Sequence, residues 1–266
     1  MSKQAVHVKD ICFAYESKMI LKHLSMDIVP NNICFIMGNN GSGKTTLLKN
    51  MMGFLLPQQG EIQIAGENVA NIDKQTMSRL VSYVPQAIHL NTDFSVIDYI
   101  SLGRTPHMGM LSKMTNKDYQ IIEDVSVLLG VDEIYEIPFN KLSGGQKQMV
   151  AIARSLVQDT PVIIMDEPMS ALDIGKQVDL LKVLYDLSKK GKTIIITTHN
   201  PNHALAVESD ACFLREGEIV AFGKSSDIIC NDLLQQIYGQ NILLDHGEKT
   251  DAVVFNKNSI QKHDFS

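Results

Sequence analysis

Apolar positions along this chain follow two periods, one typical of strands and one typical of helices. Apolar runs of four or five residues, bounded by polar or turn residues, predict buried strands over 33–37, 162–165 and 193–197. Looser alternation predicts strands over 6–13, 24–29, 61–65, 81–84, 211–215 and 218–222. The helical period predicts helices over 47–52, 74–80, 95–102, 116–129, 147–157 and 174–189.

The order of these elements indicates an α/β fold. Buried strands that alternate with helices predict a parallel sheet covered on both faces. No strand is expected between residues 96 and 136, so this part of the chain should be a helical insertion. Beyond Gly239 the sequence becomes polar and weakly patterned, and we expect the end from about Asn256 to be mobile.

Composition narrows the class of protein without defining it. The chain has 266 residues, of which 44% are hydrophobic, and a net charge of -6, which argues weakly against a protein that coats nucleic acid. The four cysteines are far apart and are expected to be free thiols in a reducing cytosol. We expect neither a signal peptide nor a membrane helix, because no apolar run approaches the required ~18 residues.

A glycine-rich loop between a predicted strand and a predicted helix is the strongest local motif. The loop 38–46 reads Gly-Asn-Asn-Gly-Ser-Gly-Lys-Thr-Thr, which is the spacing of a phosphate-binding loop. Its small residues allow backbone N–H groups to surround a phosphate at a helix N-terminus. Lys44 would contact the β- and γ-phosphates, and the Thr45 hydroxyl would bind Mg²⁺. The chain is therefore expected to bind a nucleoside triphosphate.

Further candidate residues follow the ends of other strands. Asp166 and Glu167 end the strand at 162–165, and because successive strand residues point to opposite faces, we expect different roles for them. Asp166 would orient Mg²⁺, and Glu167 would polarise the attacking water. Tyr15 is either an ordinary surface tyrosine or a ring that stacks on adenine. His199 follows the strand at 193–197, at the same edge of the expected sheet.

A second glycine-rich helix start, Leu142-Ser143-Gly144-Gly145-Gln146, suggests another anion site. Since the loop 38–46 already accounts for one triphosphate, this second site suggests a nucleotide held by another copy of the chain. With it, the sequence resembles the ATP-binding cassette (ABC) family up to about Tyr238. The matching elements, in family order, are Tyr15 (A-loop), 38–46 (Walker A), Gln86 (Q-loop), 142–146 (signature), 162–167 (Walker B), 170–173 (D-loop) and His199 (switch histidine).

The resemblance implies a P-loop NTPase cassette with an antiparallel β subdomain and an inserted helical subdomain. One domain would span residues 1–240, with its core at 1–86 and 141–240 and its helical part at about 87–140. Residues 241–266 would be a C-terminal extension. Glu167, His199 and Gln86 would be catalytic, and Thr45, Gln86 and Asp166 would hold Mg²⁺. The nucleotide-binding residues would be Tyr15, Gly38, Asn39, Asn40, Gly41, Ser42, Gly43, Lys44, Thr45 and Thr46.

The resemblance also implies partners. Two copies would form a head-to-tail dimer that encloses two ATP molecules, each between Walker A of one copy and Leu142, Ser143, Gly144, Gly145 and Gln146 of the other, with Asp173 in the D-loop. The helical part would dock on two integral-membrane permease subunits at the cytoplasmic face of the cell membrane. A substrate-binding protein would be an indirect partner, and no nucleic acid is expected.

The segment Gly103-Arg104-Thr105-Pro106-His107 is similar to one in importers for iron-siderophores, haem and cobalamin. Gln177 and 237–239 also resemble that subfamily, whereas 198–202 resembles its molybdate or tungstate branch. The sequence leaves open a soluble cassette ATPase, such as an iron–sulfur assembly subunit, or a drug-exporter cassette. The exporter is disfavoured because exporters usually fuse the cassette to membrane helices.

Overall fold

The computed structural model describes residues 4–88, 93–109, 113–248 and 250–256. A six-stranded mixed sheet lies at its centre, with strand order β10-β9-β3-β8-β7-β6, in which β10 alone is antiparallel to its neighbour. The strands are β3 (Ile33–Met37), β6 (Val81–Val84), β7 (Val162–Asp166), β8 (Thr193–Thr198), β9 (Asp210–Arg215) and β10 (Glu218–Lys224). The predicted parallel sheet is thus confirmed, with β10 added as an antiparallel edge strand.

The apolar runs of the central strands are continuous because both faces of the sheet are covered. In β3, Ile33, Phe35 and Met37 pack in the core on the helical side, whereas Cys34 and Ile36 pack in a second core beneath the antiparallel sheet. Since alternate residues of a strand point to opposite faces, a strand buried on both faces must be apolar throughout.

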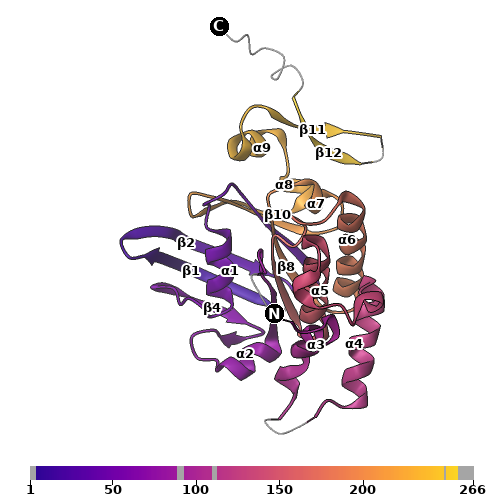
Figure 1. The fold of residues 1–266 in the computed structure, drawn as a ribbon. Coiled ribbons are helices and arrows are strands. Elements are labelled where there is room, and N and C mark those ends of the chain that lie inside the picture. Colours follow the sequence, from indigo (N-terminus) through magenta and orange to yellow (C-terminus); the bar gives the residue numbers. More distant parts are fainter. Residues whose placement is uncertain (1–3, 89–92, 110–112, 249, 257–266) are drawn as a thin grey trace.

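The second sheet is antiparallel, with order β2-β1-β4-β5. Its strands are β1 (Val6–Tyr15), β2 (Lys18–Ile28), β4 (Gln59–Ile64) and β5 (Glu67–Asn68). The prediction that the second strand begins at residue 24 was wrong, because a tight hairpin pairs Tyr15 with Lys18 and extends the ladder to the turn. In Figure 1 this sheet and α1 (Lys44–Met51) lie on the opposite side from the helical part.

The remaining helices of the described chain cover the sheet or form the insertion. The core helices are α2 (Lys74–Leu80), α5 (Gly144–Val157), α6 (Ile174–Lys189), α7 (Asn202–Leu205), α8 (Ser225–Ile228) and α9 (Asn231–Tyr238). The helix predicted from Lys147 begins at Gly144 instead. A reciprocal capping box between Ser143 and Gln146 satisfies the first backbone N–H groups and starts the helix one turn earlier.

The insertion is helical, as predicted. It contains α3 (Val96–Ser101), α4 (Asn116–Leu129) and the 3₁₀ helices η1 (Leu102–His107), η2 (Asp132–Ile134) and η3 (Phe139–Lys141). Thr115 caps α4 and Gly130 ends it at a positive φ of 63°. A buried ion pair between Arg104 and Asp118 ties η1 to α4, and Arg104 also donates to the Val157 carbonyl of α5.

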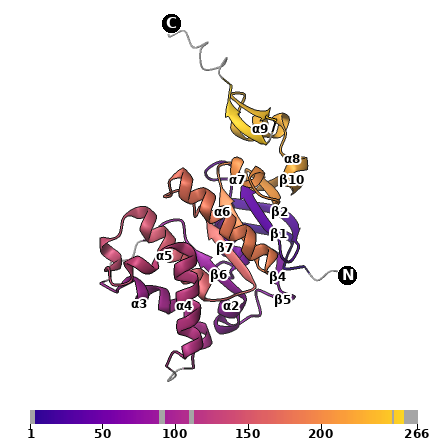
Figure 2. The same cartoon turned by 90° about the vertical axis from the view of Figure 1, so that its right-hand side faces the viewer.

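The C-terminal extension is structured, which its weak sequence pattern did not predict. β11 (Ile242–His246) and β12 (Asp251–Phe255) form an antiparallel hairpin. It stands beyond the body of the molecule beside α9 in both views (Figure 1, Figure 2). The Asn202 side chain of α7 both donates to and accepts from the backbone of Val253. The end that was expected to be mobile, after Asn256, lies outside the described residues.

Candidate functional site

The loop 38–46 leaves the carboxyl end of β3 and turns into α1 through three glycines with positive φ. These are Gly38, Gly41 and Gly43, at 146°, 79° and 107°. At Gly38 a Cβ would lie 2.2 Å from the Leu214 carbonyl oxygen and 2.8 Å from Ser42 Oγ, so a larger residue could not be accommodated. The loop conformation therefore depends on glycine for both φ and space.

A cavity of about 510 Å³ opens over this loop. Residues of the loop and of the start of α1 form one wall, namely Asn40, Gly41, Gly43, Lys44, Thr45 and Thr46. The opposite wall includes Gln86 and Glu167. Within the loop, Ser42 Oγ is buried without a hydrogen-bond partner in the described part of the chain. Small loop residues, a helix N-terminus and a lysine make this cavity suited to a triphosphate.

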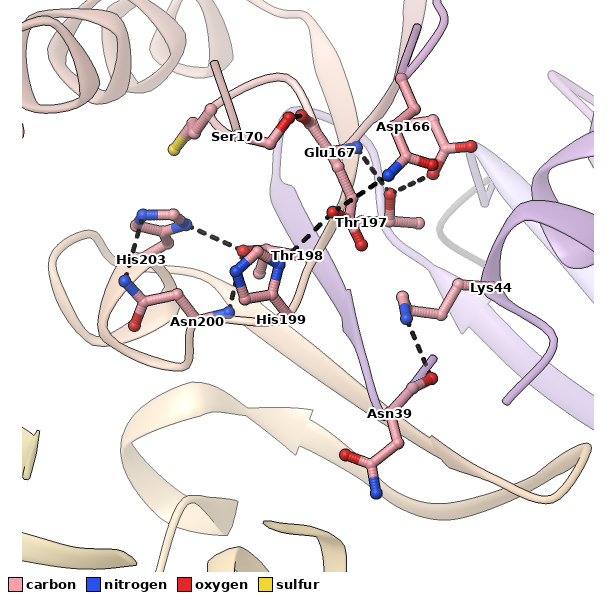
Figure 3. Close-up of polar contacts among 12 residues, drawn as sticks. Asn39, Lys44, Asp166, Glu167, Ser170, Thr197, Thr198, His199, Asn200 and His203 are labelled. Atoms are coloured by element: carbon pink, nitrogen blue, oxygen red, sulfur yellow. Dashed lines mark hydrogen bonds and ion pairs between the residues drawn. The ribbon is translucent and has the colours of Figure 1, made fainter. Parts of the chain in front are cut away.

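The Lys44 side chain lies across the loop. Its Nζ donates to the carbonyl oxygens of Gly38 and Asn39 at 2.9 and 3.2 Å (Figure 3). Burial lowers the pKa of Lys44, and the nearby charges of Glu167 and Asp166 oppose that shift. Asn39 is held in turn by a 2.6 Å bond from its amide to the Ile237 carbonyl. The loop therefore places a cation beside two carboxylates at the end of β7.

Both carboxylate oxygens of Asp166 are fixed by hydroxyl groups. Thr45 Oγ1 donates to Oδ2 at 2.8 Å, and Thr197 Oγ1 donates to Oδ1 at 2.6 Å. Asp166 is 2% exposed. The carboxylate of Asp166 and the hydroxyl of Thr45, both predicted to hold Mg²⁺, thus lie side by side, and such oxygen donors are the ligands that Mg²⁺ prefers. The structure fits a Mg²⁺ ion at this position.

Glu167 follows Asp166 at a backbone φ of 47°, in the left-handed region. Its N–H donates to Thr197 Oγ1 at 2.8 Å, which holds the turn. Its Oε2 lies 3.4 Å from Gln86 Nε2 and 3.3 Å from His199 Nδ1. The three side chains expected to be catalytic are therefore close together beside the loop, and Figure 3 shows two of them, Glu167 and His199.

The segment 142–146 lies at the start of α5. None of its residues is among the described residues that line this cavity. Ser143 is exposed, with its Oγ accepting from the Gln146 N–H. Gly145 packs against the next loop, since a Cβ there would lie 3.1 Å from the Ala171 carbonyl oxygen. Asp173 caps α6 by accepting from the Lys176 N–H at 2.9 Å. One chain therefore holds the two glycine-rich helix starts apart.

Tyr15 lies at the end of β1 and is 44% exposed. Its ring packs edge-to-face on Phe13, with centroids 5.0 Å apart. The cavity wall on this side is formed by Lys18, Met19 and Ile20 of β2, and Tyr15 is not one of its described lining residues. Stacking of this ring on adenine remains a prediction.

Several residues that organise the site were not anticipated from the sequence. Thr197 bridges Asp166 and Glu167, and its only sequence signal is its place at the end of a buried strand. His203 and Gln177 lie behind His199 and contact each other at 3.2 Å. Burial lowers the pKa of His203 to about 4, with the charge of His199 as a smaller cause. These contacts join positions far apart in the sequence, so local pattern could not show them.

Comparisons with known proteins agree with this geometry. Residues 21–170, more than half of the chain, match the family described as "ABC transporter". The "Probable iron chelatin transport ATP-binding protein" of Helicobacter pylori (strain ATCC 700392 / 26695) is 33% identical over 81% of this chain and 88% of its own. The ferric enterobactin transport ATP-binding protein FepC of Escherichia coli (strain K12) is 29% identical over 89% and 88%.

A solved structure supports the same assignment over nearly the full length. It is described as an inward-facing conformation of a metal-chelate type ABC transporter. It is 27% identical, with a TM-score of 0.83 over 97% of this chain and 99% of that chain. In the described residues, none of the helices has the length and apolar character needed to cross a membrane. A phosphate-binding loop facing two strand-end carboxylates, together with these relatives, places the chain in the ABC transporter family as a subunit that binds and hydrolyses ATP.

Proposed function

We propose that this chain energises a binding-protein-dependent importer. Its cargo would be an iron-siderophore, haem or cobalamin. The observation that supports it most directly is the full-length similarity to a metal-chelate type transporter, together with the iron-chelate relatives. The subunit would lie at the cytoplasmic face of the membrane, bound to two permease subunits and, through them, to a substrate-binding protein.

Hydrolysis would use the three side chains gathered beside the loop. The Glu167 carboxylate would accept a proton from the water that attacks the γ-phosphate, while His199 and Gln86, both within 3.4 Å of that carboxylate, would orient the phosphate and the water. Lys44 would contact the β- and γ-phosphates. Thr45 and Asp166 would hold Mg²⁺, with Gln86 as a further ligand, and the ion would neutralise phosphate charge.

This assignment is tested with Glu167→Gln in the purified full-length chain. The amide keeps the shape of the side chain but cannot accept the proton, so turnover should fall by about 100-fold or more while ATP still binds. Equilibrium binding of a fluorescent ATP analogue, measured beside steady-state hydrolysis, separates the two effects. Normal turnover by this variant would rule out Glu167 as the base.

The position of segment 142–146 supports a head-to-tail dimer. Its N–H groups at the start of α5 lie outside the cavity of their own chain. In a two-fold dimer they would contact the γ-phosphate bound to the second copy, and the second copy's segment would do the same in return. Hydrolysis would then require two chains, and its rate per chain should rise with protein concentration until the dimer is saturated.

A groove between the core and the helical insertion supports a permease partner. It has a volume of about 750 Å³, and its lining residues include Phe54, Met77, Tyr83, Leu102, Pro106 and Arg154. Phe54 and Leu102 are 66% and 42% exposed, so the groove presents apolar side chains to solvent. The strand β6 runs from Tyr83 in this groove toward Gln86 in the nucleotide cavity.

Since only two residues lie between Tyr83 and Gln86, a short permease helix seated in the groove could shift Gln86. Phe54→Asp should abolish co-purification with the permease while leaving ATP binding by the free chain unchanged. Val127→Asp, at a residue that is 57% exposed on α4, is the matched control and should co-purify normally. Equal recovery of the permease with both variants would contradict docking in this groove.

The cargo is tested in cells that lack the chain. Uptake of radiolabelled iron-siderophore, haem, cobalamin and molybdate should be compared before and after the gene is restored, with Glu167→Gln as the inactive control. Restoration of iron-chelate, haem or cobalamin uptake alone supports the proposal. Restoration of molybdate uptake alone would assign the cargo to the molybdate branch.

A further inference from the structure

A second, smaller cavity lies behind the catalytic groups. Its volume is about 120 Å³, and Glu167 and His199 form part of its wall. The rest of the wall includes Gln177, Thr198, Asn200 and His203. Figure 3 shows His203 and Asn200 on the side of His199 away from Lys44. Gln177, Thr198, Asn200 and His203 are not among the described residues that line the nucleotide cavity, so binding of phosphate does not explain these four polar groups.

The hydrogen bonds of Gln177 connect His203 to the loop before α6. Gln177 Nε2 donates to the carbonyl oxygens of Met169 and Leu172, at 3.1 and 3.0 Å. Because both amide hydrogens are used, its Oε1 faces His203 Nε2, 3.2 Å away. Asn200 Nδ2 lies 3.4 Å from the same nitrogen, and His203 Nδ1 contacts Thr198 Oγ1 at 2.9 Å.

Thr198 and Asn200 then fix the turn that carries His199. Thr198 Oγ1 accepts from the Asn200 N–H at 3.1 Å, and Asn200 Oδ1 accepts from the Asn202 N–H at 3.1 Å. The His199 side chain is itself 64% exposed. Its 3.3 Å contact with Glu167 therefore depends on where this turn places the backbone.

The contacts of Gln177 lead from His203 to the loop before α6. The carbonyl groups that hold Gln177 belong to Met169, directly before the D-loop segment 170–173, and to Leu172 within it. Ala171 in this loop packs against Gly145 of the segment 142–146. The side chains of Gln177 and His203 thus connect the loop beside the proposed partner-facing segment to the turn that carries His199.

We propose that Gln177 and His203 are positioning residues that hold His199 against Glu167 and set that geometry from the loop 169–173. The proposal rests on the roles of Glu167 and His199 given above. Neither Gln177 nor His203 is among the described residues that line the nucleotide cavity, so both act through His199 and not on ATP.

The test is steady-state ATP hydrolysis by the purified full-length chain. Gln177→Leu and His203→Phe remove the polar groups while keeping much of the volume, and Thr198→Val removes one hydroxyl with almost no change of shape. Each should lower kcat by about 10- to 100-fold, because a small displacement of a catalytic group has effects of this size. The KM for ATP should stay within about twofold of the wild-type value, since binding does not use these residues.

The decisive comparison repeats each substitution in a His199→Ala background. If these residues act through His199, they should cause no further loss there. His7→Phe, on β1 in the antiparallel sheet, is the control for a histidine replacement and should leave kcat unchanged. Urea unfolding of every variant shows which of them are folded, and Thr198→Val provides the measurement if His203→Phe does not fold.

The outcomes separate this inference from the proposed function. If a substitution lowers kcat by the same factor in the wild-type and His199→Ala backgrounds, its residue has a merely structural role and the inference is overturned. The inference is also overturned if all three variants have a normal kcat while His199→Ala is slow. Normal hydrolysis by His199→Ala would instead remove the proposed role of His199, and with it the basis of the inference.

Discussion

The buried histidine behind the switch turn makes the stability of the chain depend on pH. Burial lowers the pKa of His203 to about 4 from its ordinary value of 6.5, and the charge of His199 contributes less. His203 is 8% exposed. Below about pH 6.5 the unfolded chain therefore binds a proton at this residue that the folded chain does not bind. The stability that the folded chain gains from keeping His203 neutral is fully present above pH 6.5 and is lost as the pH falls toward 4.

The size of the effect follows from the two pKa values. With 6.5 in the unfolded state and about 4 in the folded state, the free energy of unfolding should fall by up to about 2 kcal/mol between about pH 7 and about pH 5. His203→Gln removes the titrating group and retains a polar side chain. The wild-type chain should therefore lose up to about 2 kcal/mol more than this variant over the same interval.

Urea unfolding followed by circular dichroism at both pH values measures this difference. The chain has eight histidines, and comparing two variants removes the contributions that they share. If wild type and His203→Gln lose the same free energy between the two pH values, His203 is not held neutral by burial.

Three further perturbations test other parts of the structure. Ser143→Arg should block ATP-driven dimerisation, measured by light scattering, without weakening ATP binding by the monomer; a collapse of monomer binding would contradict a role toward the second copy. Tyr15→Ala should weaken ATP more than inorganic triphosphate in competition assays, and equal losses would exclude adenine stacking. Asp118→Asn should lower the free energy of unfolding by about 3 kcal/mol, because it leaves the buried Arg104 without its ion pair; urea unfolding near pH 7 measures this, and a loss below about 1 kcal/mol would argue against it.

Local pattern was sufficient for the central sheet and for the phosphate loop. The buried strands β3, β7 and β8 are continuous apolar runs because both of their faces are covered, and the sequence shows such runs directly. The loop 38–46 is equally visible, since glycine is required where φ is positive and where a Cβ would collide with Leu214. Strand ends then place Asp166, Glu167 and His199 at one edge of the sheet.

Features that depend on long-range contacts could not be predicted in this way. The C-terminal hairpin alternates only weakly, and its position depends on α9 and on the side chain of Asn202, which bonds the Val253 backbone. Gln177 and His203 are 26 residues apart and meet only because α6 and α7 pack beside the same strand end. Gln177 is noticed in the sequence only through its subfamily resemblance, and neither residue has a local pattern that indicates this contact.

The two sides of the candidate site are held with different rigidity, and this difference has a physical cause. The hydroxyl groups of Thr45 and Thr197 donate to the two carboxylate oxygens of Asp166. All three residues lie in the central sheet or in α1. His199 instead stands exposed on a turn, and a buried neutral histidine connects that turn to a loop outside the sheet. By the inference above, a shift of that loop would reach His199 through Gln177 and His203, whereas the hydroxyl groups that hold Asp166 lie outside the loop. ATP binding and the positioning of His199 for hydrolysis can therefore respond to different contacts, as a subunit that must bind ATP first and hydrolyse it later requires.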